Sequence, residues 1–159
     1  MTKIYTLADA RAERIALKTR NEPCQYDIEQ AAEMNARADK ISALQVGDGI
    51  SVSLWTDQDA YTIISRSETR MILQQDKATL DPSFKPEWVA GGFAGHCTNQ
   101  DEQLYSYERD PQGLIVEISL RRYTHNNTER RIWKKKGIGR KDIGGSVSCG
   151  RRKFHDYNF

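Results

Sequence analysis

The chain has 159 residues, of which 38% are hydrophobic and 29% charged, with a formal net charge of +2. This length is enough for one domain, or for a small barrel with an accessory helical element, and it excludes two large independent domains. No apolar run approaches the roughly 18 residues of a membrane span, and the N-terminus lacks the features of a secretory signal, so we expect a cytoplasmic protein.

Two amphipathic helices are expected at the start of the chain. Residues 6–20 place Leu7, Ala12, Ile15 and Ala16 on one stripe behind a capping Thr6. Residues 24–42 follow Pro23, and their apolar residues recur every three or four positions: Cys24, Ile28, Ala31, Met34, Ala38 and Ile41. Both stripes are rich in alanine, which favours packing of these helices against another element.

At Gly47 the period of the hydrophobic pattern changes from helical to alternating. Ile50, Val52 and Leu54 alternate with polar residues in the segment 49–57, as in a half-buried strand. The segments 60–67 and 69–76 are also rich in strand-forming residues, and the links 57–59 and 67–68 are short enough for hairpins. We therefore expect a three-stranded antiparallel meander, which is similar to the opening of an SH3-like barrel.

The second half of the chain predicts further strands. Residues 81–92 contain two prolines and end in glycine, so they predict a connection with at most a short edge strand. The segment 103–110 and the segment 114–122 are expected to form a hairpin around the turn sequence "DPQG". Final strands are expected on either side of the glycine-rich segment 137–145.

The predicted fold class is therefore α+β. Two N-terminal helices precede a small antiparallel barrel, SH3-like in its opening, or a bent sheet. Residues 1–45 form a helical element and residues 46–159 an antiparallel β domain, within one structural unit.

No metal site or cofactor is expected. The three cysteines, Cys24, Cys97 and Cys149, are far apart and form no Cys-x-x-Cys pair, so they predict free thiols. The segment "GIGRKDIGG" lacks the Gly-Lys-Ser/Thr ending of a P-loop and the glycine spacing of a dinucleotide site.

The polar segment 91–103, "GGFAGHCTNQDEQ", raises the question of an active site. A hydrolase or nuclease could use His96 with Asp101 or Glu102, but adjacent residues of an extended segment point to opposite faces, so His96 and Cys97 are poor partners. The alternative is a structured loop in which Thr98, Asn99 and Asp101 bond the local backbone. We favour the loop, and expect no catalytic residues.

Charge is distributed unevenly along the chain. Residues 111–159 contain 12 basic and 4 acidic residues, a net charge of +8, whereas residues 57–110 contain 5 basic and 10 acidic residues, a net charge of −5. Cations interleaved with aromatic rings suit nucleic acid, because cations neutralise phosphates and rings stack on unpaired bases. The alternative is a solvated cationic face. The expected binding residues are Arg121, Arg122, Arg130, Arg131, Trp133, Lys134, Lys135, Lys136, Arg140 and Lys141.

Four segments of the chain resemble a known group of proteins. They are "WTDQDAYTIISRS", "LQQDKATLDPSFKPEWVAGGFAGHCTNQDEQ", "YSYERDPQG" and "GRRKFHDYNF". Their amino-acid sequences are similar to those of small, largely uncharacterised proteins carried by phages and other mobile elements of bacteria. The resemblance covers residues 50–115 and 144–159, leaves out the basic run at 120–143, and carries no residue roles.

A mobile-element origin would imply an anti-defence role in the cytoplasm of a bacterial host. Inhibitors of CRISPR nucleases are similar in size and likewise lack catalytic motifs, and they commonly imitate nucleic acid or compete with it. Imitation would use an acidic face, which residues 57–110 could supply, and competition would use the basic third of the chain instead. The leading hypothesis is therefore a non-enzymatic protein that binds a nucleic acid or a nucleoprotein, with inhibition of a CRISPR effector as its sharpest form. The rivals are the hydrolase or nuclease at His96 and a phage structural or host-interaction protein.

Overall fold

The computed structural model describes residues 22–91, 94–136 and 145–158. One α-helix, α2 (Gln25–Ser42), precedes the strands β1 (Gly49–Leu54), β2 (Asp57–Arg66), β3 (Arg70–Gln75), β4 (Lys77–Leu80), β5 (Trp88–Gly91), β6 (Ala94–Cys97), β7 (Tyr105–Glu108), β8 (Ile115–His125), β9 (Thr128–Lys135) and β10 (Val147–Cys149). A short 3₁₀ helix, η1 (Gln100–Glu102), lies between β6 and β7. The α+β class is confirmed. Of the two helices expected, the described residues contain the second, and the one expected over 6–20 lies outside them.

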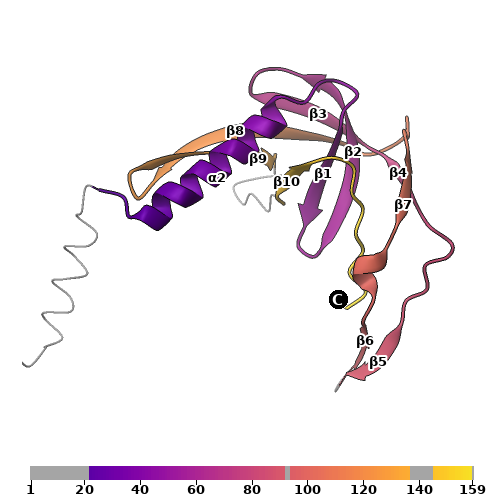
Figure 1. Ribbon diagram of the computed structural model, residues 1–159. Coiled ribbons are helices and arrows are strands. Elements are labelled where there is room, and N and C mark those ends of the chain that lie inside the picture. Colours follow the sequence, from indigo (N-terminus) through magenta and orange to yellow (C-terminus); the bar gives the residue numbers. More distant parts are fainter. Residues whose placement is uncertain (1–21, 92–93, 137–144, 159) are drawn as a thin grey trace, which may run out of the picture.

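Helix α2 forms where the helical spacing predicts it. Cys24 occupies its N-cap, and Asp27, Ala31, Ala38 and Ile41 are its buried residues. The small alanine side chains let the helix axis approach the strands closely. As a result α2 lies along β9 and reaches β10 near its C-terminal end (Figure 1).

The main sheet has six antiparallel strands in the order β10-β1-β2-β3-β8-β9. Its two outer strands approach each other, because Lys134 of β9 forms an isolated bridge with Ser146, just before β10. The sheet is therefore strongly curved and nearly closed into a barrel (Figure 1). This confirms an antiparallel, barrel-like sheet.

The core lies between this curved sheet and α2. Its largest fully buried side chains are Trp133 and Tyr61, accompanied by aliphatic residues of four strands and the helix: Ile41, Ile50, Val52, Ile63, Met71, Leu73 and Ile118. Burial raises the pKa of the Tyr61 phenol to about 12, with the nearby Asp59 adding to the effect.

Two details of the predicted meander are wrong. The strand expected over 49–57 ends at Leu54, and the turn is Trp55–Thr56, so residues 57–59 begin β2. Trp55 adopts a positive φ of 45°, which reverses the chain within two residues. The turn contains no glycine or asparagine, the residues that usually adopt a positive φ, so the sequence pattern does not predict it.

The predicted hairpin of 103–110 with 114–122 is also wrong. Strand β7 pairs with β4, whereas β8 pairs with β3 and β9. Gly113 lies so close to the end of β3 that a Cβ atom there would come within 2.0 Å of the Gln75 carbonyl oxygen. Because Gln75 N also donates to the Leu114 carbonyl at 2.9 Å, the chain after the turn is directed onto β3.

Strands β4 to β7 form an arm at one end of the molecule. β4 and β7 make one two-stranded sheet, and β5 and β6 make another beyond η1 (Figure 1). The C-terminal segment runs from the main sheet to this arm, where Tyr157 packs against Trp88 and Phe84 with ring centroids 6.2 and 6.1 Å apart.

Candidate nucleic-acid interface

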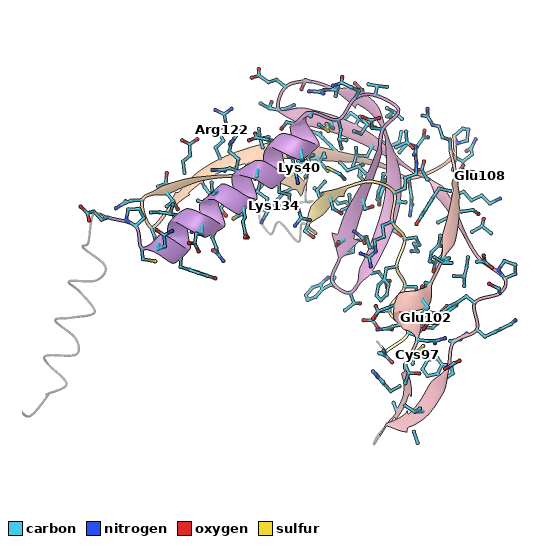
Figure 2. All side chains as sticks on the ribbon, in the orientation of Figure 1. Lys40, Cys97, Glu102, Glu108, Arg122 and Lys134 are labelled. Carbon is cyan, nitrogen blue, oxygen red and sulfur yellow. The ribbon has the colours of Figure 1, made fainter. Side chains whose placement is uncertain are left out.

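The expected basic residues lie mainly on the β8–β9 ladder, but on both of its faces. Opposite residues of a ladder share a face, and successive residues alternate. Arg122 is opposite Arg131, whereas Lys134 is opposite Ser119. Arg122 and Lys134, both labelled in Figure 2, therefore lie on opposite faces. Arg140 and Lys141 lie outside the described residues.

Arg130 is committed to the packing of α2. It is 5% exposed, and its guanidinium donates to Asp27 at 3.0 Å, to Gln30 at 3.1 Å and to Thr128 at 3.2 Å. The Cys24 thiol, which donates to Asp27 at 3.0 Å, is the largest cause lowering the pKa of that carboxyl, followed by Asn126, Arg130 and His125. Arg130 is therefore not available to a ligand.

Arg131 and Trp133 also hold the helix. Arg131 makes two hydrogen bonds to the Asp39 carboxylate, at 2.6 and 2.9 Å, and its backbone N–H donates to Asn35. Trp133 is 1% exposed, and its indole N–H donates to the Ser42 hydroxyl at 3.0 Å. The aromatic residue expected to stack on bases is therefore a core residue.

A group of cations lies together on the face of the sheet opposite the buried Ile118. Arg70 of β3 is opposite Ser119 of β8, which is in turn opposite Lys134 of β9. Glu117, one position along the same face of β8, accepts from Lys136 at 3.2 Å and lies 3.8 Å from Arg70. Arg121, opposite Ile132, lies on the same face. We call the three residues Arg70, Lys134 and Lys136 the outer-face cluster.

Two members of the outer-face cluster, Arg70 and Lys136, lie beside the carboxylate of Glu117. Strands lie about 4.8 Å apart, so Arg70 and Lys134 start from backbone positions about 10 Å apart. Lys134 forms no hydrogen bond or ion pair through its side chain within the described part of the chain. The cluster is therefore a compact site of positive charge that spans three adjacent strands.

The basic residues at the C-terminus neutralise the acidic middle of the chain. Arg151 pairs with the buried Asp76 at 2.8 Å, and both side chains bond the Thr62 hydroxyl. Lys153 pairs with Asp59 at 2.6 Å. The separation of charge along the sequence is thus partly cancelled in the fold, at Asp59 and Asp76.

Within the expected loop 91–103, residues 97–103 connect the arm and the C-terminal segment through hydrogen bonds. The Asn99 amide accepts from the backbone N–H of Glu87 at 2.8 Å and donates to the carbonyl of Lys85 at 2.9 Å. Asn158 bonds both backbone groups of the buried Cys97, at 2.7 and 3.3 Å. Gln100 and Gln103 accept from the backbone N–H groups of the C-terminal residues Tyr157 and His155.

The alternative catalytic set is not assembled by hydrogen bonds. His96 is exposed on β6, and within the described residues it makes no hydrogen bond or ion pair with Asp101 or Glu102. Glu102 lines a polar cavity of about 270 Å³ with Asp81, Glu87 and Asn99, whereas His96 does not. Ser83, through its hydroxyl and backbone N–H, lowers the pKa of Asp81 in this cavity.

A metal site is not found at this end of the molecule either. No group of three His, Cys, Asp or Glu side chains in the described part of the chain is arranged to hold a metal ion. Cys97 and Glu102 lie on the arm, away from the β8–β9 ladder that carries Arg122 and Lys134 (Figure 2). The two candidate sites are therefore spatially separate.

The sequence pattern does not predict Arg70 as a binding residue. This residue belongs to the acidic segment 57–110, and only the pairing of β3 with β8 brings it beside Lys134. Local sequence carries no signal for that juxtaposition.

No helix in the described part of the chain combines the length and the apolarity that a membrane crossing requires.

Comparison of the chain with protein-family models, with curated proteins and with solved structures gives no significant match, so the arrangement of its own residues is the basis for any functional assignment.

Proposed function

We propose that this protein binds nucleic acid, free or within a nucleoprotein, without catalysing a reaction. The observation that carries the proposal is the outer-face cluster, in which Arg70, Lys134 and Lys136 lie close together on neighbouring strands and two of them share the Glu117 carboxylate. Such a cluster attracts phosphates and releases their counterions, which gives salt-dependent affinity.

The position of the cluster favours binding over a structural role. Arg130 and Arg131 hold α2 through Asp27 and Asp39, so the fold has its own set of paired arginines. Lys134 belongs to the same strand and has no such partner in the described residues. A lysine left to solvent within a group of cations is suited to contact an external anion.

The resemblance to mobile-element proteins supports a more specific version of the proposal. In this version the protein acts in the cytoplasm of a bacterial host and inhibits a CRISPR effector, by competing for its guide or target nucleic acid. The outer-face cluster is the surface that would compete.

The proposal is tested with matched lysine variants. Affinity for single- and double-stranded DNA and RNA is measured over a range of salt concentrations for the wild type, Lys134→Ala and Lys135→Ala. Lys135 is adjacent in sequence but shares the opposite face with the buried Ile118. We expect Lys134→Ala to weaken binding and to reduce the slope of log affinity against log salt by about 0.7–0.9.

The same test defines what contradicts the proposal. Wild-type protein without salt-dependent affinity for any of these nucleic acids would overturn it, and equal effects of Lys134→Ala and Lys135→Ala would remove the outer-face cluster from it. The CRISPR-effector version is tested by affinity capture of the protein together with its partners from a bacterial host that carries a CRISPR system, with and without nuclease treatment. An assay of target cleavage by the captured effector then tests inhibition.

A further inference from the structure

Trp55 occupies an unusual position at the tip of the β1–β2 hairpin. It is 89% exposed, and its φ of 45° lies in the left-handed region. The hairpin closes between Leu54 and Asp57, so Trp55 is the first residue of a two-residue turn. Glycine is the usual residue for a positive φ at this position.

The other tight hairpin turn in the sheet shows the contrast. It joins β8 to β9 through Asn126 and Asn127, which have φ values of 45° and 56°. Asparagine tolerates this conformation, whereas a large side chain is strained in it. Trp55 therefore combines a strained backbone conformation with an exposed ring, and residues with a strained backbone cluster at active and ligand-binding sites.

A continuous strip of the outer surface connects Trp55 with the outer-face cluster. Lys134 is bridged to Ser146, and the backbone N–H of Ser53 donates to the Ser146 carbonyl at 2.9 Å. The register of β1 with β10 places Ser53 opposite Ser146 and on the same face. Ser53 lies about 10 Å from Lys134 at the backbone, two strand spacings away, and two residues before Trp55.

The charges beside this strip favour an anionic chain. Arg152, whose backbone N–H donates to the Ser51 hydroxyl, is exposed on the same side of β1. The acidic neighbours of Trp55 are engaged within the protein: Asp59 pairs with Lys153 at 2.6 Å, and Asp57 accepts from the Asp156 N–H and lies 3.5 Å from His155.

We propose that Trp55 stacks on a base of a single-stranded nucleic acid whose phosphates contact Lys134 and cross the Ser146–Ser53 seam. Stacking requires an unpaired base, because the faces of bases inside a duplex are covered by their neighbours. Aromatic stacking together with a cationic track is the common means of holding single strands. This inference rests on the proposed function and specifies its ligand.

The inference is tested with three variants and a short single-stranded oligonucleotide. Trp55→Gly removes the ring and relieves the turn, Trp55→Phe keeps a ring, and Trp88→Phe is a matched change at a second exposed tryptophan, on the arm. We expect Trp55→Gly to weaken binding roughly 5- to 150-fold, the equivalent of one stacked base. Trp55→Phe should retain most of the affinity, and Trp88→Phe all of it.

Salt dependence separates stacking from charge. Since Trp55→Gly removes no charge, the slope of log affinity against log salt should stay that of the wild type, whereas Lys134→Ala should reduce it. Single strands should also bind more tightly than a duplex of the same length.

The failure of this inference is distinguishable from that of the proposed function. If Trp55→Gly binds single strands as tightly as the wild type while Lys134→Ala is weakened, the stacking role is wrong and nucleic-acid binding stands. If Trp55→Gly loses only a protein partner captured after nuclease treatment, Trp55 is a protein contact and the inference is overturned. If the wild type binds no nucleic acid, both proposals fall.

Discussion

The β8–β9 ladder carries basic residues from one short run of sequence, and these residues serve different purposes. Where α2 packs on the ladder, Arg130 and Arg131 meet the carboxylates of Asp27 and Asp39. Further along β9, Lys134 lies at the surface beside Ser119 of β8, which is in turn opposite Arg70 of β3. The difference arises from the single helix that covers one part of the ladder and supplies acids to it. A run of positive charge is therefore divided by topology into a structural half and an available half.

The largest expected effect follows from removing the buried guanidinium. Arg130→Met leaves Asp27 without its buried cation, and breaking one partner of such a pair costs about 3–5 kcal/mol of unfolding free energy. Unfolding by urea measures the loss. Arg122→Met, on the same hairpin but exposed, is the control and should change stability by less than about 0.5 kcal/mol.

A double variant separates a lost pair from a lost side chain. Asp27→Leu with Arg130→Met replaces both charges by apolar groups, which is often neutral relative to the wild type. If Arg130→Met alone is as stable as Arg122→Met, the structural half of the comparison is wrong.

Acid should weaken the same contact. The pKa of Asp27 is lowered from its ordinary value of 3.8, first by the Cys24 thiol, so the unfolded chain takes up a proton more readily than the folded one. The stabilisation is thus present above pH 3.8 and lost as the pH falls through the lower folded value. We expect the unfolding free energy of Asp27→Asn to fall less steeply below this pH, as urea unfolding at a series of acidic pH values would show. An unchanged slope would contradict the assignment.

Trp55 is expected to lower the unfolding free energy, because its backbone has a positive φ. A large side chain in the left-handed region costs about 1–2 kcal/mol, part of which glycine loses again through its freedom in the unfolded chain. Trp55→Gly should therefore raise the unfolding free energy by about 0.5–1 kcal/mol, measured by thermal and urea unfolding. A destabilised Trp55→Gly would mean that the indole serves the fold. Stability gained together with binding lost would mark Trp55 as a residue kept for contact.

Much of the fold could be predicted because the local spacing of apolar residues indicates a helix or a strand. The spacing of Ala31, Ala38 and Ile41 predicts α2, and the alternation of Ile50 and Val52 predicts β1, because burial on one face needs only the period of the element. The turn at Trp55 could not be predicted, since none of its residues favours a positive φ.

The candidate site was harder to predict than the fold. Arg130 was expected at the surface, where arginines usually lie, but its partner Asp27 is 103 residues away in sequence. Arg70 joins Lys134 only through the registers of two ladders. Such pairings depend on tertiary structure, and a scan along the chain detects the charges without their partners.

The smallest change in unfolding free energy is expected for variants of the outer-face cluster. Lys134→Ala and the double variant Arg70→Ala with Lys134→Ala remove one half-buried and one exposed charge without leaving a buried charge unpaired. The unfolding free energy should therefore change by less than about 0.5 kcal/mol per site. The double variant also relieves the mutual repulsion of neighbouring cations around Glu117. Urea unfolding measures both variants against the wild type. A loss as large as that of Arg130→Met would show that the outer face also serves the fold, and the division of the basic run into a structural and an available half would then be lost.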